Sequence, residues 1–259
     1  MVPPIPAFAR LSRPPPRGAN VEDMTKIALI TGANKGIGYE IARLLARQGV
    51  TAIVGARDEE RGRAAAERLG QPYVRIDVTD EDSVAAAAKW IEREYGTLDI
   101  LVNNAGIAGD LAQVVPSGTP ARALREVYET NVFGVVTVTN AMLPLLRRSP
   151  AGRIVNMSSE LGSLTMATAP DSPFADANFI AYNSSKSALN MVTVSYAREL
   201  EDTPIKVNAA NPGYCATDLN AHSGFRTAEQ GAAIAVRLAT LDADGPSGAY
   251  LQDAGVLPW

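Results

Sequence analysis

The stretch IALITGANKGIGYEIARLLARQ, residues 27–48, decides the fold of this chain. Its first four residues are apolar, a run of the length expected of a buried strand, and the glycine-rich segment after them is a turn signal. From Tyr39 to Gln48 the apolar residues recur at the spacing of an amphipathic helix. The stretch therefore predicts a strand, a tight loop and a helix in direct succession.

Short apolar runs and helical segments alternate along the rest of the chain. Such alternation is typical of an α/β fold in which a doubly wound parallel sheet carries helices on both faces, in three layers. We therefore predict a Rossmann-type fold, with ligands bound in the crevice at the carboxyl ends of the strands. The expected strands are 27–30, 52–54, 73–76, 100–102, 153–157 and 205–209, the expected helices include 39–48, 59–69 and 81–94, and 245–259 is expected to form a terminal strand and tail.

Length and composition fit one substantial hydrophobic core. The chain has 259 residues, of which 46% are hydrophobic and 20% charged, as in soluble globular proteins. Residues 1–23 are crowded with proline and arginine, so we expect a disordered tail there and a single domain over 24–259. The apolar run at 5–11 is too short and too interrupted for the core of a signal peptide.

The same composition argues against several classes of partner. A net charge of −4 provides no basic footprint for nucleic acid, and the chain has no apolar run that could span a bilayer. The single cysteine, Cys215, and the single histidine, His222, rule out an internal disulfide and a His/Cys metal site. We therefore expect a cytoplasmic protein with no metal and with neither a nucleic-acid nor a membrane partner.

The glycine-rich loop at 31–38 directly follows a predicted strand and directly precedes a predicted helix, the context in which such loops bind dinucleotides. Glycines lack a β-carbon, so the backbone can turn sharply and approach a pyrophosphate, whose charge the helix N-terminus favours. The spacing is not the G-x-G-x-x-G of the general fingerprint. A purely structural turn is therefore an alternative interpretation.

The end of the second strand indicates which dinucleotide is bound. An acidic residue there would accept the ribose hydroxyls of NAD, but the strand ends in Gly55, Ala56 and Arg57. Arg57 and Lys35 can instead hold the 2′-phosphate of NADP through charge-assisted hydrogen bonds. The alternative interpretation is that Arg57 and Lys35 are solvated surface cations. Asp58, the next residue, could then be taken for the acid that binds the ribose of NAD.

The loop Thr31–Gly38 resembles the TGxxxGxG turn of the short-chain dehydrogenase/reductase family, and the resemblance covers about residues 26–259. The strings at 31–38, 56–58, 94–99 and 245–259 resemble its monomeric carbonyl reductase branch. The resemblance implies an NADP-dependent oxidoreductase acting on C=O and CH–OH groups. It implies adenine contacts from Asp77 and Val78, a segment beneath the cofactor after the fourth strand, and a nicotinamide contact from Thr217. The expected cofactor-binding residues are Gly32, Asn34, Lys35, Gly36, Ile37, Gly38, Arg57, Asp77, Val78, Asn104, Ala105, Gly106, Tyr182, Lys186, Pro212, Gly213 and Thr217.

Tyr182 and Lys186 stand four residues apart in a helical stretch, so their side chains face the same way. The normal phenol pKa is about 10, and a neighbouring ammonium together with the positive nicotinamide is expected to lower the pKa of Tyr182 toward neutrality. In carbonyl reduction, hydride passes from NADPH to the carbonyl carbon while Tyr182 donates its proton to the developing alkoxide.

A serine is expected as the second donor to that oxygen, and a pair of serines follows the strand at 153–157. By resemblance the second of the pair, Ser159, fills this role and Ser158 does not. Asn131 matches the family asparagine that holds a proton-relay water beside the lysine. Taken singly, Ser159, Tyr182, Lys186 and Asn131 each have a purely structural interpretation; in family order after the cofactor loop, they predict a catalytic site.

Ser159 and Tyr182 are separated by more residues than is usual in the family. We expect the insertion, 161–180, to form part of the substrate wall and to hinder the usual tetramer, leaving a monomer or homodimer. Residues 214–227 are expected to form a mobile lid in which Tyr214, Leu219 and Phe225 offer apolar contacts. A small, fairly hydrophobic ketone, aldehyde or quinone fits this site, unless Arg226 recruits an acidic group.

Two other functions remain open on the residues alone. One is an NAD(P)-dependent dehydrogenase that oxidises a steroid or sugar alcohol, and the other is a non-catalytic NADP-binding sensor. A serine hydrolase is disfavoured, because it would need His222 as its base and the chain has no G-x-S-x-G elbow.

Overall fold

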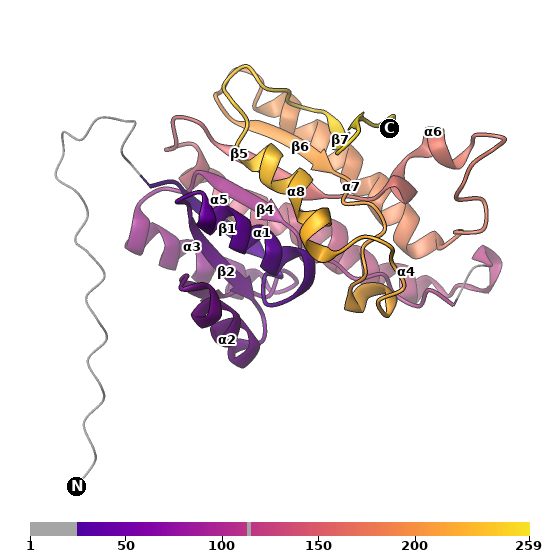
Figure 1. The fold of residues 1–259 in the computed structure, drawn as a ribbon, viewed down its shortest axis with the longest axis horizontal. Helices are drawn as coiled ribbons and strands as arrows, with labels where there is room; N and C mark the ends of the chain where they lie inside the picture. Colours follow the sequence, from indigo (N-terminus) through magenta and orange to yellow (C-terminus); the bar gives the residue numbers. More distant parts are fainter. Residues whose placement is uncertain (1–24, 113–114) are drawn as a thin grey trace, which may run out of the picture.

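The computed structural model describes residues 25–112 and 115–259, so the predicted disordered tail at 1–23 lies outside the described residues. Eight strands form one sheet in the order β3-β2-β1-β4-β5-β6-β7-β8 (Figure 1). All neighbouring strands are parallel except β8, which runs antiparallel to β7. The strands are β1 (Ile27–Thr31), β2 (Thr51–Ala56), β3 (Tyr73–Arg75), β4 (Ile100–Asn103), β5 (Arg153–Met157), β6 (Lys206–Ala210), β7 (Tyr250–Gln252) and β8 (Gly255–Val256).

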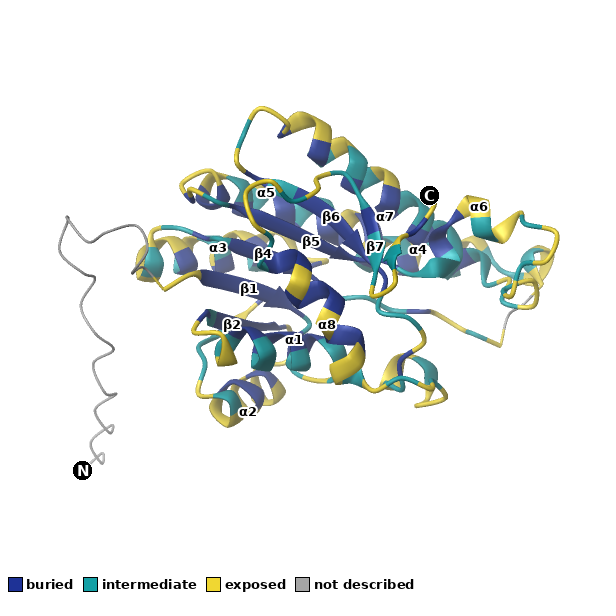
Figure 2. Cartoon of the chain, turned by 45° about the horizontal axis from the view of Figure 1, so that its top comes forward, coloured by how far each residue is buried: buried dark blue, intermediate teal, exposed yellow. Residues whose placement is uncertain are grey.

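Helices cover both faces of the sheet, as predicted. Side chains alternate along β1, so that Ala28 and Ile30 face one layer of helices while Ile27 and Leu29 face the other. Figure 2 shows the strands buried between helices whose outer faces alone are exposed. One layer holds α1 (Gly36–Arg47), α2 (Glu59–Leu69) and α8 (Ala228–Ala239), and the other holds α3 (Glu81–Tyr95), α5 (Gly134–Leu146) and α7 (Ile180–Glu199).

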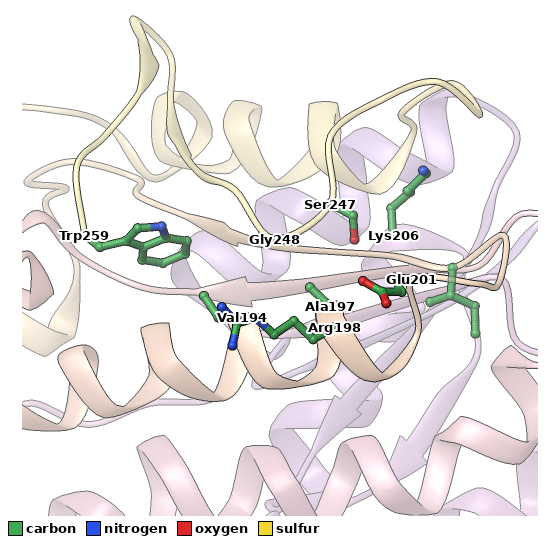
Figure 3. A pocket seen from close by; sticks show the side chains of 9 residues that line it. Val194, Ala197, Arg198, Glu201, Lys206, Ser247, Gly248 and Trp259 are labelled. Carbon is green, nitrogen blue, oxygen red and sulfur yellow. The ribbon is translucent and has the colours of Figure 1, made fainter.

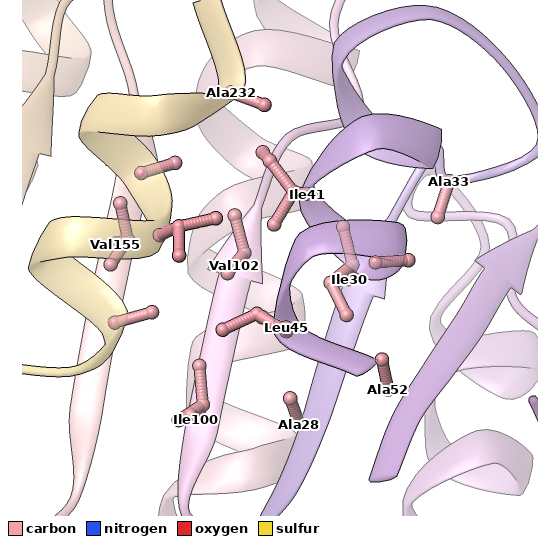
Figure 4. Close-up of a cluster of buried hydrophobic side chains, with 14 of the residues drawn as sticks. Ala28, Ile30, Ala33, Ile41, Leu45, Ala52, Ile100, Val102, Val155 and Ala232 are labelled. Carbon is pink, nitrogen blue, oxygen red and sulfur yellow. The ribbon is translucent and has the colours of Figure 1, made fainter. Parts of the chain in front are cut away.

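The helix that follows the glycine loop is fixed by its apolar face. Ile41 and Leu45 of α1 are fully buried and pack over β1 and β4 and against α8, where Ala232 allows close approach (Figure 4). Each such side chain stabilises the fold by roughly 1.5–3 kcal/mol when removed from water. The N-terminus of α1 is thereby held above the carboxyl end of β1, next to the point where the chain crosses from β3 back to β4.

Most predicted elements appear within two residues of their expected bounds, while a few differ. Helix α1 begins at Gly36 instead of Tyr39, because the last glycines of the loop already lie in the helix. The predicted terminal segment supplies β7 and the short hairpin strand β8. Shorter helices, α4 (Ala121–Tyr128) and α6 (Leu164–Ala167), flank the carboxyl edge of the sheet. Among the described residues, no helix is long and apolar enough to cross a bilayer.

Candidate active site

The glycine loop is tied to the segment after β4. The Asn104 side chain donates to Thr31 O over 2.8 Å, and the Thr31 hydroxyl accepts from the backbone N–H groups of Asn104 and Ala105 over 3.0 Å each. A β-carbon on Gly38 would lie 2.6 Å from the backbone oxygen of Gly32, so no other residue fits there without a shift of the loop. The loop, 104–106 and the start of α1 therefore form one compact unit at the mouth of the crevice.

The start of α1 can accept an anion. Its N-cap residue, Lys35, makes no side-chain cap, so the first N–H groups of the helix lack the usual side-chain partner. Gly32 and Gly36 have φ angles of 65° and 57°, a conformation that favours glycine. This end of the helix can therefore accept an anion such as a pyrophosphate.

The residues after β2 also fit the predicted dinucleotide. Arg57 is exposed, whereas the carboxylate of Asp58 caps α2 by accepting from Arg61 N over 2.9 Å. Asp58 therefore serves the helix. After the adjacent strand β3, Asp77 accepts from Thr79 and Val78 packs against Gly134.

Lys35 is not left free for a phosphate in this structure. Its ammonium forms an ion pair with Asp218, in the segment 214–227 on the opposite side of the crevice, and the ion pair lowers the pKa of the Asp218 carboxyl. His222 Nε2 lies 2.8 Å from the other oxygen of Asp218. Both members of the ion pair are about half exposed, so the contact is weak and can be exchanged for a ligand.

The catalytic residues predicted from the sequence come together at the carboxyl end of β5. Tyr182 and Lys186 lie one turn apart on α7, with Lys186 Nζ 5.6 Å from the centre of the Tyr182 ring. The Ser159 side chain lies near the phenol of Tyr182, close enough to influence its pKa. Lys186 Nζ donates to Met157 O over 2.7 Å, which holds the buried ammonium against the end of the strand.

The protein's own groups around Tyr182 shift its pKa upward, whereas the sequence predicts a downward shift from Lys186 and the nicotinamide together. Burial raises the pKa of Tyr182 to about 12, with the nearby Ser159 hydroxyl acting against this shift and the charge of Glu160 acting with it. Burial likewise lowers the pKa of Lys186 to about 8. The sequence shows the neighbouring ammonium but not the desolvation of the phenol. At neutral pH Tyr182 is therefore protonated.

The two serines after β5 have different surroundings. The Ser158 hydroxyl is buried and donates to Asn190 Oδ1 over 2.6 Å, which directs it into α7 and away from the crevice. Ser159 contacts Tyr182 and caps the 3₁₀ turn η4 (Glu160–Gly162) through Leu161 N at 3.3 Å. The geometry thus separates the two in the way that the family resemblance implies.

This difference predicts unequal effects of two matched substitutions. Ser159→Ala is expected to lower kcat/KM for a carbonyl substrate by about 10²-fold, because one donor to the developing oxyanion is lost. Ser158→Ala is expected to change kcat/KM by less than about threefold while lowering stability by about 1 kcal/mol. Steady-state kinetics and urea unfolding of both variants measure this. Equal kinetic losses would contradict the assignment.

Asn131 lies in a π-helical turn, η3 (Glu129–Phe133), between α4 and α5. Its amide exchanges hydrogen bonds of 2.9 Å with both backbone groups of Ile107 and donates to Ser185 Oγ over 3.0 Å. A β-carbon on Gly106 would lie 3.3 Å from Asn131 Oδ1 and 3.7 Å from Lys186 Nζ. Asn131, Gly106 and Lys186 are therefore in one neighbourhood, which the sequence predicts without revealing the π turn.

Segment 214–227 folds over the crevice on the side opposite α7. Thr217 lies against Gly36, and Gly213, with a φ of 71°, begins the segment after Pro212. The Tyr214 and Phe225 rings meet edge to face, and Phe225 is 85% exposed. The Arg226 guanidinium is occupied by Asp253 and by Gln230 O, so a role in recruiting an acidic substrate group is not favoured.

A small hollow lies beside Tyr182. Apolar side chains from the segment after β4, from α4 and from the end of the insertion provide most of its wall. The lining residues are Ala108, Asp110, Thr119, Ala123, Phe179, Ile180, Ala181 and Tyr182. A larger hollow, which includes Val194, Arg198 and Trp259, lies along the other half of α7 and contains none of the predicted site residues (Figure 3).

Comparison with known proteins identifies the class. Residues 26–225 match the family described as short chain dehydrogenase, and the chain belongs to that family. It is 41% identical over 226 residues to the short-chain dehydrogenase anuI of Penicillium roqueforti, covering 83% of this chain and 88% of the relative. It is 33% identical over 279 residues to carbonyl reductase (NADPH) 1 of Bos taurus, covering 90% and 98%.

Solved structures agree with this assignment. A short-chain dehydrogenase of Shigella flexneri, complexed with NADP, superposes with a TM-score of 0.77 at 29% identity, covering 88% of this chain and 96% of the other. The chain is thus an oxidoreductase of the short-chain dehydrogenase/reductase family, with carbonyl reductases among its relatives.

Proposed function

We propose that the protein is an NADPH-dependent carbonyl reductase that acts on a small, fairly hydrophobic ketone, aldehyde or quinone. The observation that carries the proposal is the position of Tyr182, with the Ser159 hydroxyl on one side and the Lys186 ammonium on the other. This grouping adjoins a glycine loop and a helix N-terminus that fit a dinucleotide. When bound, NADPH supplies the hydride.

The chain's own residues handle the proton and the developing negative charge. Tyr182 holds its proton at neutral pH, because burial raises its pKa, and can donate that proton to the carbonyl oxygen. Ser159 offers a second donor to the same oxygen. The Lys186 ammonium stabilises the phenolate that remains, and Asn131, beside Lys186, can hold the water through which Tyr182 regains a proton.

The hollow beside Tyr182 supports the proposed substrate class. Ala108, Ala123, Phe179 and Ile180 offer apolar surface, and Phe179 and Ile180 come from the end of the 161–180 insertion. The Asn183 side chain donates to Ala177 O over 2.7 Å, which ties that insertion to α7 directly beside Tyr182. An uncharged carbonyl compound with a compact apolar body matches such a wall.

The test is the consumption of NADPH by the purified protein in the presence of a panel of hydrophobic ketones, aldehydes and quinones. We expect turnover with several of them, and tighter binding of NADPH than of NADH. Tight NADPH binding without turnover on any member of the panel would favour a sensor. Faster oxidation of a steroid or sugar alcohol with NAD would favour the dehydrogenase alternative.

Arg57 is expected to determine the preference for NADPH. Arg57→Gln should weaken NADPH binding by about 10- to 100-fold, the loss of a charge-assisted hydrogen bond to the 2′-phosphate, and leave NADH binding nearly unchanged. Titration of both cofactors into the variant measures this. Arg63→Gln, at an exposed arginine of the nearby helix α2 that pairs with Glu59, is the control. Equal losses for NADPH and NADH would count against Arg57 as a phosphate ligand.

A further inference from the structure

Pro258 and Trp259 form hydrogen bonds with the segment that follows Ser159. The Ser163 hydroxyl donates to Pro258 O over 2.7 Å, and Thr165 N donates to Trp259 O over 3.0 Å. Ser163 also accepts from Met166 N at 3.1 Å and so caps α6. The start of α6 therefore depends on residues about 95 positions further along the chain.

The Trp259 side chain is anchored on the sheet. Its indole stacks on the ring of Tyr250, with ring centres 5.3 Å apart and an interplanar angle of 18°. Tyr250 is fully buried in β7, and its carbonyl accepts from Leu257 N over 2.8 Å. Met166 of α6 packs into the cluster that Tyr250 and Leu257 form. Figure 3 shows Trp259 at one end of the hollow along α7.

The opposite side of the same segment is held by α7. Gly162 O accepts from Ser187 Oγ over 2.9 Å and from Asn190 Nδ2 over 3.2 Å. A β-carbon on Gly162 would lie 2.7 Å from Lys186 Cβ, so η4 packs against α7 without space between them. The segment 160–167 is thus clamped between the helix of Tyr182 and the tail at 257–259.

Ser159 has supports of its own. The neighbouring Ser158 bonds to Asn190, and Glu160 N donates to Asn211 Oδ1 over 3.3 Å. Release of the tail would therefore affect α6 and the beginning of the insertion before it affects Ser159. Leu164 of α6 is 66% exposed, so α6 has few other apolar contacts to hold it.

We propose that Trp259 is a positioning residue for the substrate site: by stacking on Tyr250 it holds α6 in place and thereby sets the affinity for the carbonyl substrate. This inference rests on the proposed function. Helix α6 belongs to the 161–180 insertion, whose end supplies Phe179 and Ile180 to the hollow beside Tyr182. A displacement of about 1 Å passed along the insertion would no longer orient the substrate over the reacting groups. Trp259 contacts neither Tyr182 nor the glycine loop in the interactions described above, so its effect is transmitted through the wall.

Trp259→Ala is expected to raise KM for the carbonyl about tenfold, while kcat and the dissociation constant of NADPH change by less than about twofold. Trp259→Phe keeps an aromatic ring on Tyr250 and should restore KM. Val256→Ala, in the neighbouring strand β8 at a residue 74% exposed, is the matched control. An unchanged KM in folded Trp259→Ala, or equal defects in the alanine and phenylalanine variants, would overturn the proposal.

Amide hydrogen exchange provides a readout that does not require turnover. Trp259→Ala should exchange faster at 163–168 than the wild type and Trp259→Phe, with the rest of the sheet protected as before. If the wild type shows no reductase activity, the proposed function fails while this result still decides whether Trp259 holds α6. If Trp259→Ala does not fold, Trp259→Leu replaces it in both measurements. Unchanged amide hydrogen exchange at 163–168 in Trp259→Ala would contradict the proposal.

Discussion

Replacement of Tyr182 by phenylalanine is expected to lower kcat/KM for the carbonyl substrate by about 10⁴-fold, the upper range for loss of a positioned general acid. The variant retains the ring, its packing on α7 and its distance from Lys186 Nζ, and loses only the hydroxyl that contacts Ser159. NADPH should bind to it as tightly as to the wild type, because the glycine loop and Arg57 are untouched. Initial rates of NADPH oxidation and a fluorescence titration of the cofactor measure the two quantities.

The same helix offers a matched control for this substitution. The hydroxyl of Tyr196 donates to Asn140 Oδ1 over 2.7 Å, between α7 and α5 and away from the crevice. Tyr196→Phe should therefore retain the activity of the wild type within about twofold. If Tyr182→Phe kept more than a tenth of the wild-type rate, Tyr182 would not be the proton donor.

Replacement of Lys186 by methionine is expected to act in opposite directions on activity and stability. Turnover should fall by about 10³-fold, because the phenolate left by proton transfer loses its neighbouring charge. The free energy of unfolding at pH 7 should increase by about 1–3 kcal/mol. Removal of the buried ammonium stabilises the fold, and loss of its hydrogen bond to Met157 O offsets part of that gain. The thermal and urea midpoints should both rise.

The pH dependence of this stability difference follows from the lowered pKa of Lys186. Its pKa is about 8 in the folded protein and 10.5 in the reference state, so the unfolded chain binds the extra proton between these values. Below pH 8 the buried charge destabilises the wild type fully, and this penalty fades as the pH rises toward 10.5. The advantage of Lys186→Met should therefore be large at pH 7 and small at pH 10. Lys89→Met, at an exposed lysine, is the control. A Lys186→Met protein less stable than the wild type at pH 7 would contradict the predicted effect of the buried charge.

Much of the fold could be predicted because buried parallel strands read as short apolar runs, and the glycine loop marks where the first one ends. The catalytic grouping could be predicted because its spacing places Tyr182 and Lys186 on one helix face. The π turn at Asn131 could not, since one extra residue in a helix leaves no periodic signal. The ion pair between Lys35 and Asp218 joins residues 183 positions apart, and only the folded chain brings them together.

The desolvation of Tyr182 could not be predicted for a related reason. Helical spacing shows which charge lies near a group but not how far water is excluded from it, and here burial is the largest influence on both Tyr182 and Lys186. The stacking of Trp259 on Tyr250 could likewise not be predicted from the sequence, because the residues around Trp259 show no periodic pattern that indicates burial.

The position of Asp58 constrains how the proposed preference for a phosphorylated dinucleotide could be reversed. Its carboxylate stands next to the place where a ribose-binding acid would be needed, yet it closes the first turn of α2. Turning that side chain toward a ribose would leave the helix start open, at a loss of about 1 kcal/mol. A redesign toward the unphosphorylated dinucleotide would therefore introduce a new acid in place of Arg57 and leave Asp58 where it is.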